Sequence, residues 1–199
     1  VLLSRTRRDF MAFQAQVEPL LWLGPSLGWV PVYGGDLAAS RELLQMADLL
    51  LESGDVASAA SQPLLAALTG DENVNPAGLV ALLGAAQPEL IKANETLDQA
   101  LQLRDALEME RLSPRSRSLI EENLDPLLPV MEDALTLATS LPGLLGASSD
   151  GPKTYLLMVQ NEDELRPTGG FITAIGTLVV QDGNVVAVSF VNSGELENW

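Results

Sequence analysis

The sequence contains no cysteine and no histidine among its 199 residues. Without cysteine the chain has no disulfide, no thiolate metal site and no cysteine nucleophile. Without histidine it lacks the commonest general base and the commonest transition-metal ligand. Most hydrolase mechanisms depend on one of these residues, so we expect no catalytic residue, no metal site and no cofactor.

Basic residues and long apolar runs are also scarce. The chain has 11 basic and 27 acidic residues, a net charge of −16, which repels the phosphate backbone of nucleic acids. The longest uncharged segment, residues 19–35, contains three prolines and four glycines and is therefore unsuited to a membrane-spanning helix. We expect no nucleic-acid partner and no bilayer-spanning segment within the chain.

Leucine and alanine recur every three or four residues over most of the first 140 positions, which indicates amphipathic helices. The expected helices cover residues 3–23, 36–68, 76–111 and 114–140. We expect a kink or restart at Pro63 and an interruption near Gly84 and Pro88. Because short polar turns return each helix beside the last, the pattern predicts an antiparallel up-and-down bundle.

Helix starts are marked by residues that can accept hydrogen bonds from free backbone N–H groups. Asp36 is expected to cap the helix that follows it, and Asn75-Pro76 and Ser113-Pro114 pair a capping side chain with a proline suited to the first helical position. Ahead of Asp36, Trp22, Trp29 and Tyr33 are predicted to cover the open end of the bundle. A ligand platform and a membrane-interface belt are the alternatives for these rings.

The periodicity changes from helical to alternating after the breaker-rich linker at residues 141–150. Residues 154–160 form an apolar run typical of a strand covered on both faces, and 171–181 and 184–192 flank Asp182-Gly183, a favoured hairpin turn. We therefore predict an α+β fold: a helical bundle over residues 1–147, then over 148–199 a β-hairpin and strand from a truncated sheet domain.

The loop "NEDELRPTGGF", residues 161–171, is the clearest candidate for a ligand site. Its candidate binding residues are Glu164, Arg166, Thr168, Gly169 and Gly170. The glycines would let backbone N–H groups approach an anion that the planar arginine side chain also binds. Two alternatives remain open at this point: a tight connection in which Arg166 pairs with a neighbouring acid, and a carboxylate site for a hard cation.

Two segments resemble a known bacterial family, the domain of unknown function 4012. They are "LGWVPVYGGDLAASRELLQMADLLLESG" and "YLLMVQNEDELRPTGGFITAIGTLVVQDGNV". The resemblance implies an envelope protein with an N-terminal membrane helix. We accordingly expect a membrane tether upstream of Val1, which suits the cluster Arg5, Arg7 and Arg8, and an extracytoplasmic location.

The second segment is also similar, more distantly, to the start of the LytR-CpsA-Psr envelope transferases, which act on polyprenyl pyrophosphate-linked glycopolymers. That likeness implies an anionic lipid-linked ligand, with Arg166 and Glu164 at its pyrophosphate and metal end. Our leading hypothesis is a non-enzymatic, membrane-tethered envelope module whose helical bundle is a spacer or binds a protein partner. The alternative is a glycopolymer transferase or polyprenyl-pyrophosphate-binding protein that uses the Arg166 loop.

Overall fold

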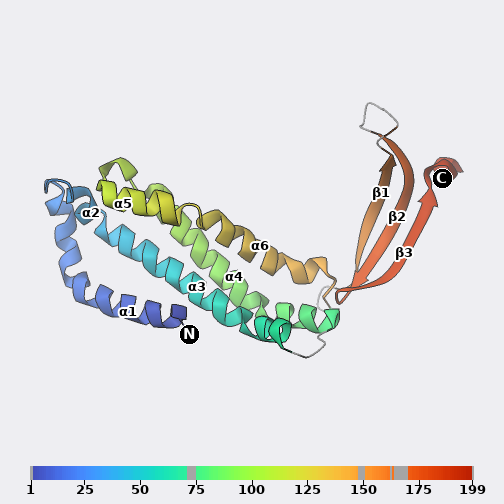
Figure 1. Cartoon of the computed structure of the whole chain (residues 1–199), viewed down its shortest axis with the longest axis horizontal. Coiled ribbons are helices and arrows are strands. Elements are labelled where there is room, and N and C mark those ends of the chain that lie inside the picture. The colour runs from blue at the N-terminus through green and yellow to red at the C-terminus, as the bar shows by residue number, and fades with distance from the viewer. Residues whose placement is uncertain (1, 71–74, 148–150, 162, 164–169, 199) are drawn as a thin grey trace. The chain divides into compact units, whose positions relative to one another are not determined.

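The protein is described by a computed structural model covering residues 2–70, 75–147, 151–161, 163 and 170–198 (Figure 1). Helical elements come first and a three-stranded antiparallel sheet follows them, which confirms the predicted α+β class. The elements in chain order are α1 (Leu2–Val17), η1 (Glu18–Leu27), α2 (Gly34–Ala38), α3 (Ser40–Thr69), α4 (Pro76–Ala106), η2 (Met109–Arg111), α5 (Pro114–Leu119), η3 (Ile120–Leu124), α6 (Leu128–Leu144), β1 (Lys153–Asn161), β2 (Phe171–Gln181), β3 (Asn184–Asn192) and η4 (Ser193–Asn198).

The chain forms two compact units. The helical unit contains residues 1–63 and 86–139, and the sheet unit contains residues 64–85 and 140–199. Segments of α3, α4 and α6 thus contribute to both units. The two units are defined by packing, and the predicted boundary between two domains at 147/148 stays a prediction. None of the helices in the described part of the chain combines the length and apolarity needed to cross a bilayer.

The helical unit is an up-and-down arrangement in which α1, α3, α4 and α6 alternate in direction (Figure 1). Leucine and alanine from α3, α4 and α6 fill its core, and Leu97 and Ala93 of α4 are fully buried. A buried hydrogen bond joins two of these helices, because the Ser53 hydroxyl donates to the Ala93 carbonyl oxygen at 2.7 Å. Small residues at this contact let α3 and α4 approach closely.

Three helices continue through prolines. Pro63 lies inside α3, Pro88 inside α4 and Pro142 inside α6. The predicted interruption of the third helix near Gly84 and Pro88 is therefore wrong, because packing of the flanking turns outweighs the hydrogen bond that each proline removes. α4 also ends at Ala106, five residues before the predicted end.

Two other predicted helices are subdivided. The first ends as an α-helix at Val17 and continues as the 3₁₀ helix η1, while the last is divided into α5, a π-helical segment (η3) and α6. After the π-helical segment Leu127 is 57% exposed, while Leu128 is buried. A π-helical turn inserts one extra residue per turn, which rotates the apolar stripe that follows it.

The two predicted proline-linked caps are confirmed. The Gly78 N–H donates to the Asn75 side-chain oxygen at 2.7 Å at the start of α4. The Ser116 N–H donates to the Ser113 hydroxyl at 3.2 Å at the start of α5. Each cap satisfies a backbone donor that has no partner inside its own helix.

The sheet has the strand order β1-β2-β3 with both pairs antiparallel. The hairpin turn is confirmed, since Asp182 (φ 48°) and Gly183 (φ 74°) both adopt the positive φ that a type I′ turn requires. The expectation that β1 is covered on both faces is wrong: Leu156 and Met158 are 64% and 63% exposed. One face of β1 therefore lies open in the sheet unit.

The hairpin turn is anchored to the end of α6 within the sheet unit. The Asp182 N–H donates to the Gly146 carbonyl oxygen at 2.8 Å, and the Gly183 N–H donates to the Leu145 carbonyl oxygen at 2.9 Å. These bonds satisfy two carbonyls that follow the helix C-terminus, where no intrahelical donor is available.

Candidate functional site

An apolar pocket lies in the helical unit between α1–η1 and α3, and we call it the α1 pocket. It encloses about 500 Å³ and its surface is almost wholly apolar. Its lining residues are Phe13, Val17, Leu20, Leu21, Leu23, Gly24, Leu27, Asp36, Leu37, Ser40, Leu43 and Leu44. A volume of this size falls within the range of small-molecule pockets, roughly 300 to 1,000 Å³.

Polar contacts hold the first turns of α1 against α3. The Ser4 hydroxyl donates to the Asp55 carboxylate at 2.6 Å, and the Arg7 guanidinium lies 2.8 Å from the Glu52 carboxylate. Arg7 is therefore bound to α3 through an ion pair and is not surrounded by solvent on all sides. This contact fixes one end of the wall of the α1 pocket.

Close backbone packing fixes the other end of that wall. Gly24 of η1 is buried, and a Cβ at its position would overlap the carbonyl oxygen of Leu37 in α2. Only glycine permits this approach without displacing the backbone. Because both ends of α1–η1 are held, the pocket between them is formed by the fold itself.

Asp36 supplies the main polar group of the pocket lining, and its carboxylate holds the start of α5. It accepts from the Ser113 N–H at 2.7 Å, the Ser113 hydroxyl at 2.6 Å and the Ser116 hydroxyl at 2.8 Å. The prediction that Asp36 caps the helix after it is wrong, because it lies inside α2 and serves a helix 77 residues further on.

The pKa of Asp36 reflects two opposing effects. Burial works to raise it, but the hydrogen bonds from Ser113 and Ser116 outweigh burial, so the pKa lies below the ordinary value of 3.8. The carboxylate is therefore ionised at neutral pH. A ligand in the α1 pocket meets apolar walls with one anionic group whose oxygens already accept hydrogen bonds.

A second apolar pocket lies on the other side of α3, against α5 and η3, and we call it the α5 pocket. It encloses about 530 Å³. Its lining residues are Leu43, Met46, Ala47, Leu50, Leu51, Ser116, Leu119, Ile120, Asn123 and Leu124. Leu43 borders both pockets, so α3 presents apolar side chains to two open grooves.

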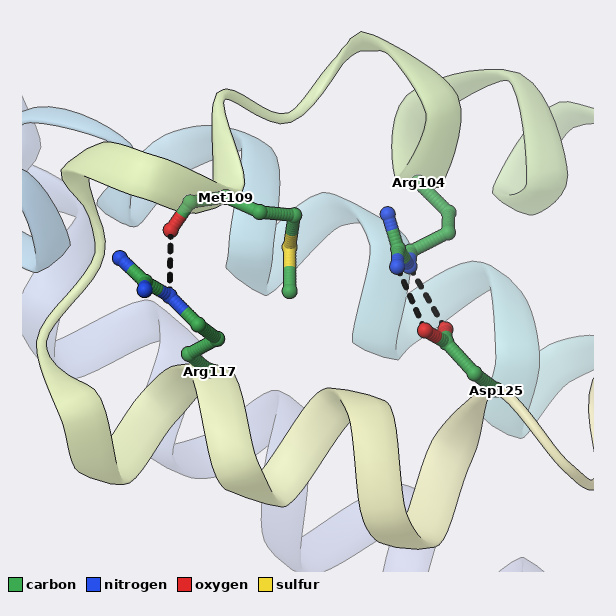
Figure 2. Close-up of polar contacts among 4 residues, drawn as sticks. All are labelled: Arg104, Met109, Arg117 and Asp125. Atoms are coloured by element: carbon green, nitrogen blue, oxygen red, sulfur yellow. Dashed lines mark hydrogen bonds and ion pairs between the residues drawn. The ribbon is translucent and has the colours of Figure 1, made fainter.

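Two arginines fix the elements that border the α5 pocket (Figure 2). Arg104 of α4 makes a two-pronged contact with Asp125, with nitrogen–oxygen distances of 2.7 and 2.5 Å. Its hydrogen bonds, together with its charge, lower the pKa of Asp125 despite partial burial. Arg117 of α5 donates to the Met109 carbonyl oxygen at 3.0 Å, which ties η2 to α5.

The aromatic residues near the α1 pocket do not cover the end of the bundle. Trp22, Trp29 and Tyr33 are 68%, 79% and 54% exposed. The prediction that they close the bundle is therefore wrong. The aliphatic side chains of the same segment, Leu21, Leu23 and Leu27, face the α1 pocket instead.

The sequence-predicted ligand loop falls mainly outside the described residues. Glu164, Arg166, Thr168 and Gly169 lie there, so the structure does not place them. Gly170 is described and buried, and a Cβ at its position would lie 2.6 Å from the Asn161 carbonyl oxygen. Among the described residues, no group of three acidic side chains is arranged to hold a metal ion.

Comparison with known proteins gives a family match for the sheet region. Residues 150–198 match the family Protein of unknown function (DUF4012). The DUF4012 match supports the family resemblance for the strands and the intervening loop, whereas the likeness to LytR-CpsA-Psr transferases is not shown. No curated protein and no solved structure matches the chain.

The α1 pocket was not predicted from the sequence. Phe13, Val17, Leu20 and Leu21 recur three or four residues apart within the expected helix over residues 3–23. The sequence feature that could have indicated the pocket is the point where these apolar residues meet the Pro/Gly-rich segment that follows the helix. An apolar stripe that runs into a helix breaker cannot be covered along its whole length by one straight neighbouring helix.

Proposed function

We propose that the helical unit is a non-enzymatic binding module that takes an apolar molecule or hydrocarbon chain into the α1 pocket. The pocket itself carries this proposal: its walls are aliphatic and aromatic, and its ends are fixed by the Arg7–Glu52 pair and the Gly24 contact. Preformed apolar cavities with few polar groups are the usual form of small-molecule sites.

The charge of the lining selects among apolar ligands. Asp36 is ionised and partly buried, so a ligand with a negative group beside it would be repelled. Ser40 offers a hydroxyl at the same pocket. The favoured ligand is therefore a neutral chain or ring system with at most a hydroxyl end group.

A matched pair of leucine variants on α3 tests the pocket. Leu44 lines the α1 pocket and not the α5 pocket, Leu51 lines the α5 pocket and not the α1 pocket, and both are partly buried. With the neutral apolar dye diphenylhexatriene as probe, Leu44→Gln should weaken binding about tenfold because it places an unpaired amide in the pocket. Leu51→Gln should leave the affinity unchanged. Equal effects, or an effect of Leu51→Gln alone, would exclude the α1 pocket as the binding site.

The cellular setting of this module is part of the proposal. We propose a bacterial envelope protein that is tethered to the membrane, with both units outside the cytoplasm, and the arginine cluster Arg5, Arg7 and Arg8 suits a segment close to the membrane. Protease protection in intact and lysed cells tests the location. Digestion of the described units only after lysis would exclude an extracytoplasmic position.

The second candidate function is a phosphate-linked glycopolymer transferase or a polyprenyl-pyrophosphate-binding protein. It is supported by the residue types in the loop, since Arg166 can neutralise pyrophosphate charge beside Gly169 and Gly170. In the full-length protein, Arg166→Ala should abolish binding of a polyprenyl pyrophosphate analogue, while Lys153→Ala, the other basic residue after Arg117, should affect it little. Unchanged affinity in Arg166→Ala would reject this function.

A further inference from the structure

An exposed apolar surface occupies one end of the helical unit, on η1 and the turn before α2. We call it the aromatic end. It consists of Leu20 (60% exposed), Trp22 (68%), Trp29 (79%), Val32 (64%) and Tyr33 (54%). Isolated exposed apolar residues are ordinary, but two tryptophans and a tyrosine together on a short segment indicate an interaction surface.

The aromatic end is held in place by its own backbone. The Val30 N–H donates to the Leu27 carbonyl oxygen at 3.0 Å, and the Gly34 N–H donates to the Val30 carbonyl oxygen at 2.8 Å. The opposite side of the segment carries Leu21, Leu23 and Leu27, which line the α1 pocket. The rings therefore project outward from a fixed frame.

Val32 adopts a strained backbone conformation within the aromatic end. Its φ is 68°, a left-handed conformation that a β-branched residue rarely adopts and that glycine or asparagine would adopt more easily. The strained position carries an apolar side chain that is 64% exposed. Burial of that side chain against a partner would offset part of this strain.

Charge distinguishes this end from the rest of the molecule. Residues 19–35 carry no charge, and the elements that meet there, residues 18–42 and 108–117, carry four arginines and five carboxylates, a net charge of −1. The remainder of the chain accounts for −15 of the total of −16. Asp36 and Ser113 join these two segments directly, at 2.7 Å. Phospholipid surfaces in bacteria are anionic or zwitterionic, so this near-neutral end can approach them while the rest is repelled.

We propose that the aromatic end docks onto the surface of a phospholipid bilayer. Tryptophan and tyrosine favour the boundary between headgroups and acyl chains, because their rings are apolar and their N–H and O–H groups remain hydrated there. Insertion is shallow, as for other peripheral apolar segments, since this short Pro/Gly-rich segment cannot span the hydrocarbon core. Within the helical unit, the residues outside 18–42 and 108–117 carry a net charge of −8, and their repulsion by an anionic surface favours the aromatic end toward the lipid.

Co-sedimentation of the chain with phosphatidylcholine vesicles, with and without phosphatidylglycerol, tests the proposal. Trp22→Ala and Trp29→Ala should each lower the vesicle partition coefficient about tenfold, because each removes a large ring from the interface. Leu119→Ala, at an exposed position on α5, is the matched control and should leave partitioning unchanged. Circular dichroism confirms that the variants keep their helical content.

Salt dependence provides a second readout. Because the chain carries a net charge of −16 and none of it lies on the aromatic end, added salt should increase binding to phosphatidylglycerol vesicles by screening repulsion, the reverse of a basic membrane-binding segment. Binding that falls with salt would overturn the proposal.

Three other results would also overturn it: no binding by the wild type, equal binding by Trp29→Ala, or a dimer of the chain, detected by light scattering, that Trp29→Ala converts to a monomer. Leu44→Gln should not alter vesicle binding, so failure of the ligand proposal and failure of this one are separable.

Discussion

The helical unit and the strands of the sheet are both rich in aliphatic side chains, but they bury them to different extents. In the helical unit, residues of α3, α4 and α6 enclose Leu90, Leu97 and Leu135 at 6% exposure or less. In the strands, Val180 is the one apolar residue in the buried core among the described residues, and every residue of β3 is exposed. Helices that pack against one another can bury their apolar faces between them, whereas each apolar face of a three-stranded sheet stays exposed unless another layer of structure covers it.

The difference shows where each region holds its stability. In the helical unit, stability comes from side-chain packing and from the polar contacts that bind helix ends. In the sheet, much of it comes from the backbone ladder and from the hairpin turn. Exposed Leu156, Met158 and Phe190 show that apolar composition alone does not indicate burial.

The largest expected effect tests this contrast directly. Leu97→Ala should lower the free energy of unfolding by about 3 kcal/mol, because Leu97 is fully buried and its truncation leaves a cavity. Val188→Ala on β3, where the side chain is 53% exposed, should cost less than about 1 kcal/mol. Urea titration of both variants measures the difference. Similar costs would show that β3 is buried in solution.

The second effect is acid sensitivity of the helical unit. Asp36 and Asp125 have pKa values below the ordinary 3.8, so their contribution is fully present well above pH 3.8 and is lost as pH falls through their folded pKa values. Asp36→Ala should cost about 2 kcal/mol at pH 7 by leaving the Ser113 N–H without its acceptor. It should also flatten the loss of stability between pH 5 and pH 2, an order-of-magnitude window for such carboxylates.

Thermal unfolding of wild type and Asp36→Ala across that pH range measures this effect. Glu122→Ala, which removes a carboxylate that accepts only from an exposed hydroxyl, is the control. If Asp36→Ala and wild type lost stability in parallel on acidification, the cap between α2 and α5 would not be the source of the pH dependence.

The smallest effects concern two glycines of the sheet unit and should have opposite signs. Gly183→Ala should destabilise by about 1 to 2 kcal/mol, because its φ is +74° and a Cβ there would lie 2.8 Å from Val80. Gly84→Ala, inside α4 with open space around its Cα, should stabilise by about 0.5 to 1 kcal/mol. Melting temperatures of the two variants measure the signs. The same sign in both would mean that the hairpin turn is not held as described.

The sequence was sufficient for features that depend on local periodicity. The change from helical to alternating spacing gave the α+β class, and Asp182-Gly183 gave the hairpin, because both depend on residues close together in the chain. The proline-linked caps at Asn75 and Ser113 were predictable for the same reason.

Features that depend on distant partners were not predictable. Asp36 caps α5 rather than the adjacent helix, and no local pattern shows that its partners are Ser113 and Ser116. Trp22 and Trp29 were expected to cover the open end of the bundle, but they are exposed, and it is the leucines of the same segment that line the α1 pocket. Of the predicted ligand loop, Gly170 is a close backbone contact, while Arg166 and its neighbours stay a prediction.

The prolines inside α3, α4 and α6 have a mechanical consequence. Pro63, Pro88 and Pro142 each lie within about one turn of a place where their helix passes from one compact unit to the other. A proline ring leaves the carbonyl four residues earlier without its N–H donor, which reduces the bending stiffness of a helix at that level. Each of these three helices therefore lacks one intrahelical backbone hydrogen bond close to the position where it passes from one unit to the other, which lowers its resistance to bending at that position.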